Sequence, residues 1–87
     1  MRINPTRIQV GDELFEASVL NREVIKWTVG NIFVEHVREN LWRTIVVLKA
    51  GKTWVEERPL SDVLYMHDTH EKAAEELTKA LRGGLDG

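Results

Sequence analysis

The sequence has no cysteine, so disulfide bonds and thiolate metal sites are excluded and the chain must fold by packing alone. It also lacks a long apolar run, since the stretch 45–48 is far too short to span a bilayer. The opening Met-Arg-Ile-Asn-Pro lacks the apolar segment of a secretory signal. We therefore expect a cytoplasmic protein with no membrane partner.

Neither sign of charge dominates. The 12 basic and 14 acidic residues give a net charge of -2. This balance argues against bulk nucleic acid as a partner, because such binding rests on many phosphate contacts, although a local basic patch is compatible with it. With 87 residues and no internal repeat or linker, the chain predicts a single domain, 1–87, with a modest core.

The usual patterns of catalytic residues are missing. Neither of the two serines, Ser18 and Ser61, lies in a Gly-x-Ser-x-Gly context. The run 51–53 (Gly-Lys-Thr) lacks the upstream glycine of a phosphate loop, and a two-residue hairpin explains it. The adjacent acids Glu56 and Glu57 point to opposite faces of a strand. We expect no catalytic residue, no cofactor and no enzyme activity.

Apolar and polar residues alternate over much of the region from about 7 to 66, which predicts strands. In residues 13–20, Phe15, Ala17 and Val19 face one way. In residues 24–37 the alternation is interrupted at Gly30, so keeping both halves buried requires a one-residue slip there. The inward residues of this longer strand are Ile25, Trp27 and Val29 before Gly30, and Ile32, Val34 and His36 after it.

Two further strands follow a polar turn at 38–40. In residues 42–49, Trp42 and Leu48 lie on the core side, and apolar residues on the other side favour cover by the C-terminal helix. A tight hairpin at 50–52 leads to a short strand, 53–57, which Pro59 ends. Residues 63–66 then form a last short strand or an extended lead-in.

The period becomes helical at Thr69, which predicts a helix over about 69–82. Its apolar stripe is Ala73, Leu77, Ala80 and Leu81. Two glycines at 83–84 predict its end, with 83–87 as a frayed tail. The fold class is mainly β with one C-terminal helix (α+β). Its architecture is a small antiparallel SH3-like barrel, or a curled five-stranded sheet with the helix packed on it.

The order of these parts resembles a group of small phage and prophage proteins of uncharacterised function. The matching motifs are the Gly-Asp-led strand at 11–15, the Val-Ile-Lys-Trp-Thr-Val strand at 24–29, and the Thr-led, Glu- and Ala-rich helix start at 69–73. The segment 56–60 has no counterpart in that pattern. The resemblance implies a barrel-plus-helix fold and an origin in a mobile element, and it supplies no catalytic residue.

The stretch 67–71, His-Asp-Thr-His-Glu, has the composition of a metal or acid–base site. A metal site would use His67 and His70, but His67 precedes the predicted helix, so the two side chains would diverge. A helix start explains the same residues: Asp68 is a good N-cap that forms a capping box with Glu71, and Thr69 is the competing cap. We favour the cap and predict no metal.

The tryptophans offer a second candidate site. Parity places Trp27 and Trp42 in the core, whereas Trp54 either packs under the helix or is exposed as a binding anchor. Basic residues on neighbouring strands could share one outer face with it, forming a platform of the kind that binds single-stranded nucleic acid. The members of this candidate patch are Trp54, Lys26, Arg43, Lys49, Lys52 and Arg58.

Two functions remain open from the sequence. The first is a small non-enzymatic binding or assembly module that acts through protein–protein contacts, including self-association. The alternative is a small barrel that binds single-stranded nucleic acid through the patch around Trp54.

Overall fold

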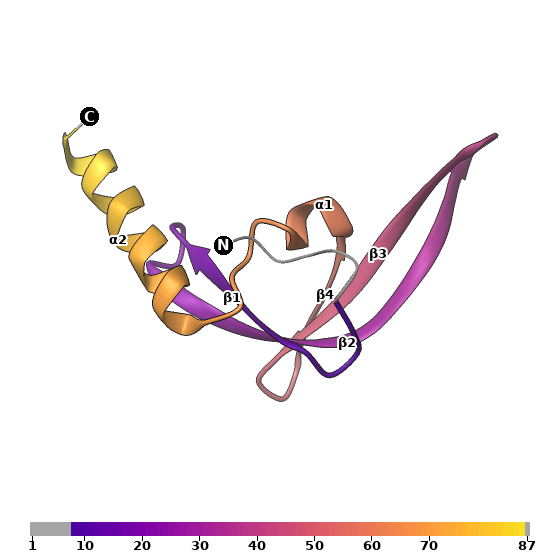
Figure 1. The fold of residues 1–87 in the computed structure, drawn as a ribbon, viewed down its shortest axis with the longest axis horizontal. Coiled ribbons are helices and arrows are strands. Elements are labelled where there is room, and N and C mark those ends of the chain that lie inside the picture. The colour runs from indigo at the N-terminus through magenta and orange to yellow at the C-terminus, as the bar shows by residue number, and fades with distance from the viewer. Residues whose placement is uncertain (1–7, 87) are drawn as a thin grey trace.

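The computed structural model describes residues 8–86, which form one curved antiparallel sheet and two helices (Figure 1). The elements in chain order are β1 (Glu13–Ser18), β2 (Glu23–Arg38), β3 (Leu41–Ala50), β4 (Trp54–Pro59), α1 (Leu60–Val63) and α2 (His70–Asp86). Each strand pairs with the next along the chain, so the sheet order is β1-β2-β3-β4. The mainly β class with a C-terminal helix is confirmed, but this sheet has four strands and is not closed into a barrel.

The core lies on the concave side of the sheet, where α1 covers it (Figure 1). Its buried members are Leu14, Ile25, Trp27, Val29, Val46, Leu48, Val63 and Met66. The short helix α1 follows Pro59, whose fixed φ of -63° ends β4. Residues 63–66 were predicted to be extended, and this is wrong: Val63 closes α1, and a turn carries Met66 into the core.

β2 changes register at Gly30, as the alternation predicts. The pairing with β3 shifts between Val29 and Asn31, so that Val29 lies opposite Leu48 and Ile32 opposite Val46. Both halves of the strand therefore direct their apolar residues to the same face. A Cβ at Gly30 would lie 2.8 Å from Cε of Lys49, whose side chain crosses the glycine.

The loop between β3 and β4 spans 51–53, so it is displaced by one residue from the predicted link at 50–52 and is one residue longer than the two-residue hairpin expected for the Gly-Lys-Thr run. Ala50 pairs with Trp54 across the turn at 51–53, where Gly51 has a φ of 62°. A two-residue loop would instead place Lys49 opposite Trp54. Because side chains alternate along a strand, the extra residue turns the whole of β4 over, and Trp54, Glu56 and Arg58 join the core face.

α2 begins at His70 and packs mainly against β1 and β2. The backbone groups of His67 and Phe15 exchange two hydrogen bonds of 2.8 Å, which hold the lead-in segment against the outer edge of β1. Ala73 and Leu77 are buried, as the stripe predicts. The predicted stop at 83–84 is wrong, because the helix runs through both glycines to Asp86. No helix among residues 8–86 has the length and apolar character needed to cross a membrane.

Candidate functional site

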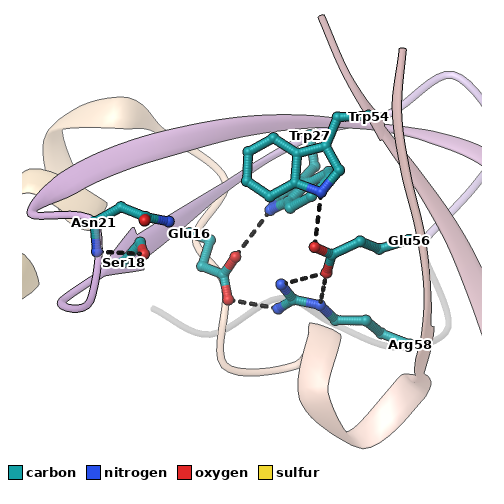
Figure 2. Close-up of polar contacts among 7 residues, drawn as sticks. All are labelled: Glu16, Ser18, Asn21, Trp27, Trp54, Glu56 and Arg58. Carbon is teal, nitrogen blue, oxygen red and sulfur yellow. Dashed lines mark hydrogen bonds and ion pairs between the residues drawn. The ribbon is translucent and has the colours of Figure 1, made fainter.

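Trp54 packs on the edge of the core against Trp27 (Figure 2). Trp27 is completely buried, in agreement with the sequence prediction, whereas Trp54 keeps 40% of its surface exposed. Their ring centroids are 4.8 Å apart at 67°, an edge-to-face arrangement that the charge distribution of aromatic rings favours. The buried side of Trp54 therefore contacts a strand residue and not a helix, and the rest of the ring faces solvent.

Two carboxylates satisfy the indole N–H groups of this pair. Trp27 donates to Glu16 at 3.0 Å and Trp54 donates to Glu56 at 2.8 Å. Arg58 lies between the two acids, with 2.5 Å from Nη1 to Glu16 and 2.7 Å from Nη2 to Glu56 (Figure 2). Its guanidinium carbon also lies 5.4 Å from the Trp27 ring centroid. We call these five residues the tryptophan cluster.

The charges of the tryptophan cluster reinforce one another. The hydrogen bond to Glu16 raises the pKa of Arg58 further, against the opposing effect of burial, and Glu56 adds to the rise. Burial alone would raise the pKa of Glu56, but hydrogen bonds from Arg58 and Trp54 outweigh it and leave that pKa lowered. Glu56 is thus held ionised, and both acids are engaged by Arg58 and by an indole N–H, which suits a structural clamp and not an acid or base that exchanges protons with a substrate.

The predicted basic patch is divided between the two faces of the sheet. Trp54 and Arg58 lie on the core face, paired with Ala50 and Val46. Lys26, Arg43 and Lys49 lie on the opposite face, because their cross-strand partners are the residues that alternate with the core. Lys52 stands in the exposed turn between β3 and β4.

The charges of this patch are also largely engaged. Lys26 binds Glu13 at 3.1 Å and Arg43 binds Glu35 at 2.6 Å. The structure therefore brings together Trp54 and Arg58 and separates them from the three other strand cations. A continuous basic track with Trp54 at its centre does not form among the described residues.

The two histidines before and at the start of α2 contact different partners. Nε2 of His67 lies 2.7 Å from Glu76, and the ring of His70 stands edge-on to Phe15. Within residues 8–86 no group of three or more His, Asp or Glu side chains is placed to hold a metal ion. The cap is Thr69, whose hydroxyl accepts the Lys72 N–H at 3.3 Å, while Asp68 instead pairs with the Lys72 ammonium.

Comparison with family models, with curated proteins and with solved structures gives no match. The resemblance to small phage and prophage proteins therefore stays a prediction. The function has to be argued from the geometry of this chain.

The most unusual surface is the far end of the β2–β3 hairpin. β1 pairs only with residues 23–28 of β2, and β4 pairs only with residues 45–50 of β3. Residues 34–44 therefore form a two-stranded ribbon that extends past the rest of the sheet, and we call it the arm (Figure 1). Its tip lies far from both helices in the view of Figure 1.

The core side of the arm carries two large apolar side chains that are exposed. Cross-strand pairing places Val34 beside Thr44 and His36 beside Trp42, on the same face as the core residues Ile32 and Val46. We call these four outer residues (Val34, His36, Trp42 and Thr44) the arm face. Val34 is 62% exposed and Trp42 is 59% exposed. The prediction that Trp42 packs in the core is wrong: the residue is on the core side, but nothing in the described chain covers it.

The ring of His36 stabilises the arm face from within. Its centroid lies 4.5 Å from that of Trp42, and its Nε2 lies 2.8 Å from the carbonyl oxygen of Glu39 in the turn. Val37 and Leu41 near the tip are also exposed. A signal for this surface was present in the sequence, because strands predicted at 13–20 and 53–57 are too short to flank a partner strand of 14 residues along its whole length.

Proposed function

We propose that this protein is a non-enzymatic binding module that acts through protein–protein contacts made by the arm face. The observation that carries the proposal is the exposure of Val34 and Trp42 on a face that is continuous with the hydrophobic core. Burial of apolar surface lowers the free energy by about 25 cal/mol per Å², and large side chains that stay in water do not gain this stabilisation. A partner that covers the arm recovers that free energy.

The architecture of the arm supports the same proposal. A two-stranded ribbon is at best marginally stable in water unless a third strand or another element packs on it. Here the ribbon is anchored at one end, next to Ile32, which packs against the core, and is open at the other. Its outer strand edges also carry unpaired backbone groups, which proteins usually protect or use for binding.

The chemistry of the arm face favours protein over nucleic acid. The face carries valine, threonine, histidine and tryptophan, and the arginine nearest to it in the ladder, Arg43, points to the opposite side and pairs with Glu35. Binding of a nucleic-acid strand needs cations along the backbone track beside the stacking residue. That condition is not met beside Trp42.

Site-specific photo-crosslinking tests the proposal. A photoreactive amino acid at Val34 is expected to give discrete, reproducible adducts to protein in cells that express the chain. The matched control carries the same group at Val55, which is similarly exposed (55%) but lies on the other face of the sheet. Adducts from position 34 that disappear on nuclease treatment would replace the proposal with the nucleic-acid alternative. Equal labelling from both positions would overturn it.

A further inference from the structure

We infer that the partner of the arm face is a second copy of the same chain, packed arm against arm about a two-fold axis. The inference rests on the proposed function, because it names the occupant of the surface proposed there. It makes the protein a homodimer whose shared core includes Trp42 from both subunits.

The exposed surface of one chain is the first argument. A compact monomer of 10.0 kDa exposes roughly 5,200 Å², whereas this chain exposes 6385 Å². The difference, roughly 1,100 Å², belongs to the whole chain, of which the uncovered arm is one part, and it exceeds the surface of about 800 Å² that each partner buries in a stable interface. The radius of gyration, 14.2 Å, likewise exceeds the roughly 12 Å of a compact chain of this length.

Shape is the second argument. A two-fold interface must be complementary to itself, because the same patch meets its own copy. The arm face has two adjacent rows, a bulky row of His36 and Trp42 and a small row of Val34 and Thr44. The rows are two residues apart along each strand, or roughly 7 Å. A two-fold axis between the rows places each bulky row over the small row of the other copy.

Charge is the third argument. The net charge of -2 opposes association of two copies only weakly. The one ion pair of the outer arm, Arg43 with Glu35, lies on the face that points away from the proposed interface, so it keeps its solvation in the dimer. No ionised acid, lysine or arginine of the arm face has to be desolvated, which would otherwise cost several kcal/mol per unpaired ion.

Sedimentation equilibrium over a wide range of protein concentration tests the inference. We expect the wild-type chain to approach twice its mass of 10.0 kDa, and Trp42→Glu to weaken association on the order of 100-fold, as loss of a central aromatic contact does. Val34→Glu should act in the same direction. Val55→Glu is the same substitution at an exposed valine on the other face of the sheet, and it should leave association unchanged.

The outcomes separate the inference from the proposed function. A wild-type chain that stays monomeric at all concentrations overturns the dimer, while crosslinks from Val34 to a different protein would still support a binding module. A dimer that both Trp42→Glu and Val34→Glu leave intact overturns the placement of the interface. Circular dichroism of each variant checks that the sheet has folded, so that loss of association is not mistaken for loss of structure.

Discussion

Arg58 in the last strand of the sheet binds Glu16 in the first, with 2.5 Å between guanidinium and carboxylate. These strands are the two edges of the sheet, and no backbone ladder joins them. The ion pair therefore spans the open side of a curled sheet and does part of what hydrogen bonding does in a closed barrel. Both side chains are largely shielded from water, which strengthens the contact relative to a surface pair.

Removing Arg58 should destabilise the fold more than removing an exposed arginine. Arg58→Ala leaves Glu16 and Glu56 without their cation, and we expect a loss of about 2 kcal/mol in the free energy of unfolding. Arg43→Ala is the control, because its pair with Glu35 is exposed and contributes at most about 1 kcal/mol. Urea denaturation of both variants measures the difference. Equal losses would show that the span between the edge strands carries no special weight.

Truncating Trp54 should expose Trp27 to water. We expect Trp54→Ala to lower the free energy of unfolding by about 2 kcal/mol, since both apolar contact and the edge-to-face interaction are lost. In a Trp42→Phe background, replacement of Trp54 leaves Trp27 as the one tryptophan, and its fluorescence should lie further to the red with Trp54→Ala than with Trp54→Phe. Trp54→Phe keeps the ring contact and loses only the hydrogen bond to Glu56, so it should shift less. Identical emission spectra of the Trp54→Ala and Trp54→Phe double variants would contradict the described packing.

Stability should fall in acid partly because of Glu56. Its pKa is lowered in the folded protein, so the folded state stabilises the ionised form. This contribution is fully present above the pKa of the unfolded chain, about 4.3 for glutamate, and is lost as the pH falls through the lower folded value. Urea denaturation between pH 7 and pH 3 should therefore show a shallower decline for Glu56→Gln than for the wild type. Parallel curves would remove Glu56 from the acid response.

Gly30 should tolerate alanine better than its position in a bulge suggests. The atom that a new Cβ would meet is the far end of a flexible lysine side chain, at 2.8 Å, and not backbone. We expect Gly30→Ala to change the free energy of unfolding by less than about 1 kcal/mol, because Lys49 can move into solvent. Gly30→Ala combined with Lys49→Ala should relieve the contact. A large loss that persists in this double variant would mean that the bulge itself requires glycine.

The start of α2 should depend on Thr69 and not on Asp68. The Thr69 hydroxyl accepts the Lys72 N–H, so Thr69→Ala should cost about 1 kcal/mol. Asp68→Ala removes an exposed pair with the Lys72 side chain and should cost less. Thermal unfolding followed by the helical circular dichroism signal compares the two. A larger effect at Asp68 would restore the capping box that the sequence also permits.

Alternation along the sequence predicted which side of the sheet each residue of β2 and β3 faces. The slip at Gly30 was predictable because two apolar half-strands with opposite parity cannot otherwise share one core. Alternation shows which face a residue lies on, but not how far along the strand other elements cover that face. Trp42 was therefore predicted to be in the core, although the core ends at Ile32. The limit was set by the lengths of β1 and β4.

The candidate site depended on a single residue in a turn. The sequence left open whether Trp54 packs under the helix or is exposed, and a two-residue hairpin would have placed it beside Lys49 on the outer face. With the observed loop, Trp54 lies on the core face of β4, where it packs against Trp27. The residue types of the loop do not determine its length, because Gly51 is compatible with both a two-residue and a three-residue hairpin loop. The helix α1 was missed for a similar reason: Val63 and its apolar neighbours have high strand propensity, and tertiary packing overrides it.

The consecutive order of the strands also bears on how quickly the chain reaches its native state. Every ladder of the sheet joins strands that are neighbours in sequence. Most of the sheet can therefore form by pairing outward from the three turns that connect β1 with β2, β2 with β3 and β3 with β4. Search over distant partners is what slows the folding of β proteins. Here the contacts most distant in sequence are those of β1 with Arg58, with His67 and with α2. The expected rate-limiting event is thus the late closure of a loop of about 50 residues onto the first strand, after the central hairpin has formed.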